Sequence, residues 1–299
     1  MLYTVLKSRL TEYSRTTLKR QFSSKQNQYP NLIFGIDNRL GNDHTTRLFL
    51  MSFLFLCAVT VVLLTGYYFD SRTLNGVPTL VKPLKFSLSL AMHFITLAIL
   101  SQQLERSRRT GVVLTLFAYI SVVSMLFEQI YISIQAARGV HSHYNTTTAF
   151  ESLMYNLMGI GAVNLILVSF VLGVLIWKYG KQDNVGLRLG SILGLTIGSV
   201  LTLYYAMTMA NIPTDSALVG EVVNNVKVPI VGWSREVGDL RIPHFIATHM
   251  MQVLPLAGLI LDKLKCPSKL LVSLLTAGLV MLSLVSFEWA LAGKAMFSI

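Results

Sequence analysis

The stretch from Leu48 to Phe69 reads LFLMSFLFLCAVTVVLLTGYYF and contains no charged residue. A helix needs about 20 mostly apolar residues to cross the hydrocarbon core of a bilayer, because about 30 Å must be covered at about 1.5 Å per residue. Six more segments meet this condition: Pro83–Leu100, Val112–Gln135, Leu153–Trp177, Leu187–Met209, Pro243–Leu261 and Leu270–Leu291. The sequence therefore predicts an all-α, polytopic membrane protein with seven transmembrane helices in one bundle.

The composition of the 299-residue chain agrees with this prediction. Hydrophobic residues make up 53% of it and charged residues only 13%, whereas an ordinary soluble domain has about 25% charged residues. The two cysteines cannot form a disulfide framework or a zinc ribbon, and no CxxC, Walker, GxSxG or HExxH motif occurs. The sequence therefore argues against a water-soluble globule and against the common soluble enzyme classes.

The basic residues are distributed unequally between the two sides of the predicted membrane. The N-terminal tail has 8 Lys and Arg and the loops around Arg106, Lys181 and Lys263 have 3 each, which gives 17 on one side against 8 on the other. Because basic residues are retained in the cytoplasm during insertion, the N-terminus is expected inside and the C-terminus outside. This topology accounts for the whole net charge of +11, so the charge indicates no nucleic-acid partner.

Residues 1–47 are predicted to form a basic cytoplasmic tail, and residues 48–299 the transmembrane domain with a larger outer loop at 210–242. In the tail, Leu2, Leu6 and Leu10 alternate with basic residues, as in an amphipathic helix lying on an anionic leaflet. A solvated tail is the alternative, and a mitochondrial presequence is a third. The preferred location is the bacterial inner membrane, with the lipid bilayer as the partner.

Three ionisable side chains, His93, Glu128 and His249, lie inside predicted helices in the outer half of the membrane. Such a group costs about 2.5 to 3.5 kcal/mol at a helix centre, so it indicates an interior partner or a polar cavity. Residues spaced by three and four form a polar stripe on the second helix, namely Lys82, Lys85, Ser89, His93 and Thr96. The third helix carries another, namely Ser121, Ser124, Glu128, Tyr131, Gln135 and Arg138. The alternative to a cavity is hydrogen bonding between helices.

Further polar residues in the outer loops extend this candidate site. The candidate ligand-binding residues are Lys82, Lys85, Ser89, Glu128, Gln135, Arg138, His143, Asn145, Trp233, Asp239, Arg241 and His244. Because imidazole both ligates metals and titrates near neutrality, His93 and His249 are the candidate ligands of a haem or a divalent metal. His244 and His249 are five residues apart, which places them about 140° apart around a helix, so they are not expected to bind one metal together.

The fifth predicted helix carries a stripe of small residues, Gly186, Gly190, Gly194 and Gly198, spaced by four. Such a stripe allows two helix backbones to approach closely. It predicts tight packing, either inside the bundle or across a homodimer.

Three segments carry a resemblance to known proteins. They are VKPLKFSLSLAMHF (Val81–Phe94), QAARGVHSHYNTTTAFESLMYNLMGIGA (Gln135–Ala162) and GWSREVGDLRIPHFIATHMMQVLPLAGL (Gly232–Leu259). They resemble a family of bacterial seven-helix inner-membrane proteins known only as conserved hypotheticals. The resemblance implies a multi-pass inner-membrane protein and no particular activity.

Three functions fit these features. The first is binding of a metal, a haem or a small ligand in an outward-facing polar cavity. The second is a proton-coupled transporter or a receptor for a small anionic solute, with the basic residues of the outer side forming a positive vestibule and with Glu128 and His93 coupling protons. The third is an intramembrane metal-dependent lipid hydrolase, since Ser89, His93 and Glu128 are similar to the polar residues of seven-helix amidases such as ceramidases. That family has an HxxxH pair on its last helix, where this chain offers only Glu288.

Overall fold

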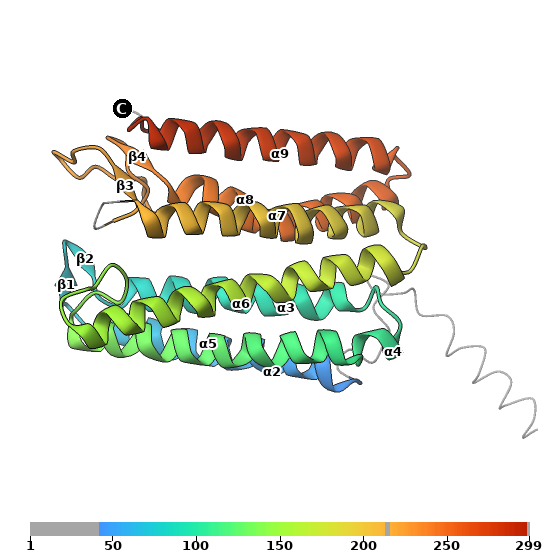
Figure 1. Cartoon of the computed structure of the whole chain (residues 1–299), viewed down its shortest axis with the longest axis horizontal. Helices are drawn as coiled ribbons and strands as arrows, with labels where there is room; N and C mark the ends of the chain where they lie inside the picture. The colour runs from blue at the N-terminus through green and yellow to red at the C-terminus, as the bar shows by residue number, and fades with distance from the viewer. Residues whose placement is uncertain (1–41, 213–215, 298–299) are drawn as a thin grey trace, which may run out of the picture. The chain divides into compact units, whose positions relative to one another are not determined.

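The computed structural model describes residues 42–212 and 216–297, so the predicted amphipathic segment of the tail lies outside the described residues. Seven long helices are present in the described part (Figure 1): α2 His44–Phe69, α3 Val81–Ser101, α5 Val112–Arg138, α6 Ala149–Tyr179, α7 Val185–Asn211, α8 Arg241–Lys263 and α9 Ser268–Leu291. All seven are long and apolar enough to cross a membrane, which confirms the predicted number of spans. The chain is therefore a multi-pass helical membrane protein.

Short elements connect the long helices. The four-residue helix α4 Arg106–Arg109 joins α3 to α5. The two-residue strands β1 Thr73–Leu74 and β2 Val77–Pro78 form an antiparallel hairpin between α2 and α3. The strands β3 Leu218–Val219 and β4 Gly238–Asp239 pair at the two ends of the loop between α7 and α8.

Local sequence signals set several helix ends. Pro83 and Pro243 lie in the first turns of α3 and α8, where a missing N–H costs no hydrogen bond. Thr148 is the N-cap of α6 and its hydroxyl accepts the N–H of Glu151 at 3.2 Å, as a capping box predicts. The Glu151 carboxylate accepts hydrogen bonds from the hydroxyls of Thr147 and Thr148.

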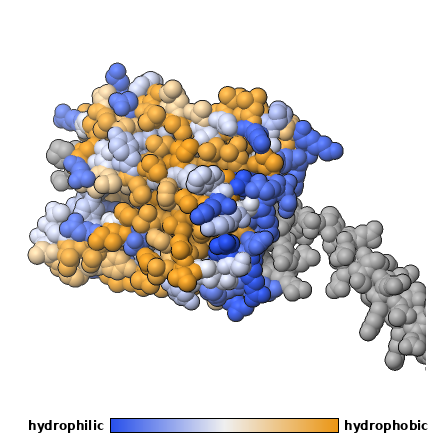
Figure 2. All heavy atoms as spheres, turned by 45° about the vertical axis from the view of Figure 1, so that its right-hand side comes forward, coloured by the Kyte–Doolittle hydropathy of each residue, from blue (hydrophilic) through white to orange (hydrophobic). Residues whose placement is uncertain are grey.

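The long helices pack mainly against their neighbours in the chain. Helix α3 lies against α2, α5 lies against α6, and α8 lies between α7 and α9 (Figure 1). Helix α6 also packs against α7, which connects the α2, α3, α5 and α6 group with the α7, α8 and α9 group. Large apolar side chains remain exposed along the helices, as expected for surfaces that face lipid, while hydrophilic residues gather toward one end (Figure 2).

The glycine stripe of α7 faces α8. A Cβ at Gly186 would lie 2.6 Å from the carbonyl oxygen of Gly258, and one at Gly198 would lie 2.9 Å from that of Ala247. Between them, Gly190 and Gly194 lie directly against the backbone at Leu254 and Met250. The tight packing predicted for this stripe therefore occurs inside the chain. A homodimer through the same glycines stays a prediction that these contacts do not support.

Candidate functional site

Three basic side chains, Lys82, Lys85 and Arg241, lie near the first turns of α3 and α8 and are called the cation cluster below. The Lys85 Nζ donates to the carbonyl oxygen of Val231 at 3.1 Å, and the Arg241 Nη2 donates to that of Gly232 at 2.9 Å. Consecutive carbonyls of one loop are thus bound by cations from two helices. The helices α3 and α8 therefore begin on the same side of the membrane protein, close to one another.

Arg241 is fixed in place by a buried carboxylate. Asp239, with a relative exposure of 1%, accepts from the Arg241 Nε at 2.8 Å and Nη2 at 2.5 Å. The same carboxylate accepts the backbone N–H groups of Ser234 and Arg241. Asp239 therefore fixes the position of Arg241 and of the loop that precedes it. Both of its carboxylate oxygens accept hydrogen bonds from within the protein.

The two lysines of the cation cluster are not balanced in this way. In the described part of the chain neither Lys82 nor Lys85 forms an ion pair, and Lys82 has no hydrogen-bond partner. Neither Leu80 nor Leu240, the N-cap residues of α3 and α8, provides a side-chain cap. The partial positive charge of the α3 end adds to the positive potential of the cluster, whereas at the α8 end Asp239 already accepts the N–H of Arg241.

Ser89 extends the cluster along α3. Gln252 of α8 donates to the Thr96 hydroxyl at 3.3 Å, which identifies the face of α3 that is turned to α8. Ser89, seven residues before Thr96, lies on the same face and is exposed. The predicted polar stripe of α3 is thus solvent-accessible at Ser89, near the start of the helix. Further along the helix, at Thr96, it is hydrogen-bonded to α8.

The loop between α5 and α6 lies beside the cation cluster. Burial lowers the pKa of His143 to about 3, and the nearby charge of Lys82 contributes in the same direction. Burial and the neighbouring Tyr155 raise the pKa of Tyr144 to about 12, against an opposing effect of Arg241. The Tyr144 hydroxyl donates to the carbonyl of Met209, which ties this loop to the end of α7. Tyr144 is not among the predicted site residues, because nothing in its local sequence distinguishes it.

The lowered pKa of His143 makes stability depend on pH. The folded protein keeps this imidazole neutral, whereas the unfolded chain takes up a proton below about pH 6.5, so stability is full above that pH and is lost as the pH falls. Between about pH 7.5 and pH 5.5 the wild type is expected to lose about 1 kcal/mol more than the His143→Gln variant. Thermal unfolding in detergent at both pH values measures this, and His141→Gln, in an exposed position of the same loop, is the control. Equal slopes for wild type and His143→Gln would contradict it.

The polar side chains at the α5–α6 loop bind other groups of the protein; they are Gln135, Arg138 and Asn145. The Arg138 Nη1 donates to the Gln135 Oε1 at 2.6 Å and lies 3.8 Å from the Glu151 carboxylate. The Asn145 Nδ2 donates to the carbonyl of His141 at 3.0 Å. These contacts close the α5–α6 loop, so the structure favours a structural role for these three predicted ligand-binding residues.

The predicted polar stripe of α5 is buried except for Arg138, whose side chain is 54% exposed. Ser121, Ser124, Glu128 and Gln135 are each less than 9% exposed. The Glu128 carboxylate lies against Gly161 of α6, where a Cβ would come within 2.6 Å of the Oε1. That Oε1 has no hydrogen-bond partner in the described part of the chain. One helical turn deeper, Asn164 of α6 donates to the Ser124 hydroxyl.

The intramembrane histidines are held at three different places. His93 forms a backbone hydrogen bond with Leu165 of α6, and His244 forms one with Thr202 of α7. The His249 ring lies 4.0 Å from the ring of Phe245. In residues 42–212 and 216–297, no group of three or more His, Cys, Asp and Glu is arranged to hold a metal. A metal or haem between His93 and His249 remains a prediction.

Trp233 lies next to the carbonyl that binds Arg241. Its ring makes an edge contact with Phe245, with 5.2 Å between centroids, and stacks on Phe297 at 5.9 Å. This predicted ligand-binding residue is thus part of an aromatic group beside the cation cluster, where it can report on binding.

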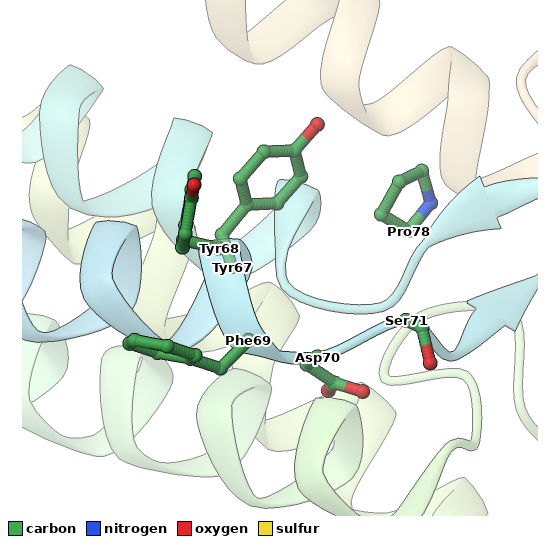
Figure 3. A pocket seen from close by; sticks show the side chains of 6 residues that line it. All are labelled: Tyr67, Tyr68, Phe69, Asp70, Ser71 and Pro78. Atoms are coloured by element: carbon green, nitrogen blue, oxygen red, sulfur yellow. The ribbon is translucent and has the colours of Figure 1, made fainter.

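An open hollow of about 340 Å³ lies at the end of α2 (Figure 3). It is lined by Tyr67, Tyr68, Phe69, Asp70, Ser71 and Pro78. None of the residues predicted from the sequence lines it. Aromatic residues at the end of a membrane helix are typical of the interface with lipid headgroups, so this hollow is explained without a ligand.

Comparisons with known proteins add no assignment. No protein-family profile matches the chain, and no curated protein sequence and no solved structure is significantly similar to it. The resemblance to bacterial inner-membrane proteins therefore stays a prediction. What the structure establishes is a multi-pass helical membrane protein in which Lys82 and Lys85, in the first turns of α3, form no ion pair with any described residue.

Proposed function

We propose that the protein binds a small anionic solute at the cation cluster, as a membrane transporter or receptor. The observation that carries the proposal is that Lys82 and Lys85 have no carboxylate partner in the described residues, although Lys85 lies close to Arg241. Like charges held together without counter-ions repel one another, and an anion relieves this repulsion. The adjacent first turns of α3 and α8 supply the dipole ends that favour negative charge.

The positive-inside rule supports an orientation in which this site faces outward. The short helix α4 and the α6–α7 and α8–α9 loops lie on the side opposite the cation cluster (Figure 1). Together with the adjoining helix ends they carry 9 of the 17 Lys and Arg in residues 48–299, including Arg106, Lys181 and Lys263, and the sequence before Leu48 contributes 8 more to that side. With that side in the cytoplasm of a bacterial cell, α3 and α8 begin at the outer face of the inner membrane, with the N-terminus inside and the C-terminus outside.

Binding of a metal or haem by His93 and His249 is the second candidate. Its support is that the His93 Nε2 and the His249 Nδ1 are both buried and have no hydrogen-bond partner among residues 42–212 and 216–297. We rank it below anion binding because the described residues offer no third ligand beside this pair. An absorption spectrum and metal analysis of the purified protein test it. The hydrolase is not proposed, since Ser89, His93 and Glu128 share no hydrogen bond in the described residues.

The Lys85→Ala variant is expected to bind small anions at least about tenfold more weakly than the wild type, because a charged hydrogen bond contributes about 1.5 to 3 kcal/mol. Titration of the purified protein with sulfate, phosphate and succinate, followed by tryptophan fluorescence and calorimetry, measures this. Trp233 supplies the optical signal because it lies beside Gly232, whose carbonyl binds Arg241.

The control for this experiment is Lys294→Ala. Lys294 is an exposed lysine after α9 and forms no ion pair in the described residues. The Lys294→Ala substitution removes one positive charge, as Lys85→Ala does, and leaves the cation cluster intact. Equal weakening by both substitutions would show a nonspecific charge effect, and no binding by the wild type would refute the proposed function.

A further inference from the structure

Glu128 is a carboxyl group buried in the membrane-spanning part of the protein. It is 2% exposed, and its Oε1 has no hydrogen-bond partner in the described residues. Gly161 of α6 provides the space for this oxygen, because any larger residue there would collide with it. A carboxylate in apolar surroundings costs several kcal/mol unless it is paired, so such a group is more stable with a proton.

Around Glu128, the packed elements place no charge that would replace the proton. On α6 the adjacent residues Gly161 and Asn164 do not titrate, and on α5 itself Tyr131 lies one turn away. On α3, the titratable residue that contacts α6 is His93, which forms a hydrogen bond with the backbone of Leu165. The charged side chains of α2 and α4 lie at the opposite end of α5, near Thr115, together with His44; they are Arg47, Arg106, Arg108 and Arg109.

The residue after Glu128 is bonded to the helix that carries the two lysines of the cation cluster. Gln129, the residue after Glu128, donates from Nε2 to the carbonyl oxygen of Pro83 at 3.4 Å. Pro83 lies between Lys82 and Lys85 in the first turn of α3. Lys82 therefore approaches the level of Glu128, but its charge acts on His143. The Gln129 hydrogen bond thus fixes α5 at Glu128 against the first turn of α3, so an ionised Glu128 would act on the cation cluster through its electric field and without a direct ion pair.

We propose that Glu128 is a proton-binding site inside the membrane and that its protonation is coupled to anion binding at the cation cluster. The coupling rests on the proposed function; the proton site itself does not. A neutral Glu128 leaves the positive potential of the cluster undiminished, whereas an ionised Glu128 weakens it. By linkage, protonation therefore strengthens anion binding, and the bound anion strengthens protonation to the same extent.

Infrared spectroscopy of the protein in lipid tests the proton site independently of any ligand. Wild type at neutral pH is expected to show the carbonyl stretch of a protonated carboxyl group, and Glu128→Gln is expected to lose it. The matched control is Glu288→Gln, which changes an exposed carboxyl in α9. A wild-type band that persists in Glu128→Gln, or no such band in the wild type, would overturn the proton site.

The coupling is tested by sulfate titrations at several pH values, because sulfate keeps its charge across the neutral range. In the wild type the dissociation constant is expected to rise with pH, by up to about tenfold per pH unit where one proton is released. In Glu128→Gln it is expected to stay low and nearly constant. The same pH slope in both proteins would overturn the coupling, whereas sulfate binding that is absent in both would refute the anion site and leave the infrared result unaffected.

Discussion

Gly190→Ala is expected to destabilise the protein by about 3 kcal/mol, because overpacking a close contact costs 1 to 3 kcal/mol and more when backbone atoms are involved. A Cβ at Gly190 would overlap the carbonyl group of Leu254 and the nitrogen of Pro255. These are backbone atoms of α8, so no change of side-chain rotamer relieves the collision. The substitution therefore forces α7 and α8 apart.

Pro255 makes this contact less adjustable. A proline inside a helix donates no hydrogen bond to the preceding turn, so α8 lacks one backbone hydrogen bond there. Gly190 thus lies against the point of α8 where this hydrogen bond is missing. A shift of α8 away from α7 would also affect Asp262, whose carboxylate accepts the N–H groups of Gly186 and Leu187 at the start of α7.

Thermal unfolding in detergent measures the effect, with two glycines as controls. A Cβ at Gly159 of α6 or at Gly278 of α9 would meet no atom within 4 Å. Alanine at these positions is expected to be neutral or to stabilise by up to about 1 kcal/mol, since alanine favours helix. If Gly190→Ala unfolds at the same temperature as these two variants, the close α7–α8 contact is wrong.

The glycine stripe illustrates what the sequence determines and what it leaves open. Its spacing of four predicts a surface for close approach, because residues i and i+4 share a helix face. The partner of that surface depends on which helix is brought beside α7, and no local pattern in α8 shows it. The seven spans were predictable for the same reason as the stripe, since hydrophobic length is a property of each segment alone.

In the candidate site, too, some features follow from the local sequence and others only from the packing of the helices. The stripe containing Lys82, Lys85 and Ser89 follows from helical periodicity. Their proximity to Arg241 requires α3 and α8 to start side by side, which is a property of the packing. Arg138 is equally basic and lies on the same side, yet it is paired with Glu151 and Gln135. The sequence alone does not distinguish an arginine that is paired from lysines that have no ion-pair partner in the described part of the chain.

At the opposite side of the protein, Asp43 and Arg109 form a buried ion pair. The Arg109 Nε donates to the Asp43 Oδ2 at 3.0 Å, and the side chains are only 9% and 2% exposed, respectively. Asp43 is also the N-cap of α2 and accepts the N–H and the hydroxyl of Thr46 at 2.9 Å each. One carboxylate thus caps the first membrane helix and neutralises the arginine that precedes α5.

Asp43→Asn is expected to destabilise the protein by about 3 to 5 kcal/mol, because removing one partner leaves the other charge buried and unpaired. Asparagine retains the size of the side chain and one cap acceptor, so the loss reports the charge rather than a cavity or a missing cap. Thermal or denaturant unfolding in detergent provides the measurement.

Asp70→Asn is the matched control for Asp43→Asn. Asp70 also pairs with an arginine, Arg72, at 2.8 Å, but the Arg72 side chain is 55% exposed. Solvent screens an exposed pair, so its loss is expected to cost about 1 kcal/mol or less. The two substitutions remove the same charge from an Asp–Arg pair and differ in burial. Equal losses of stability in the two variants would mean that burial of the Asp43–Arg109 pair contributes nothing to the fold.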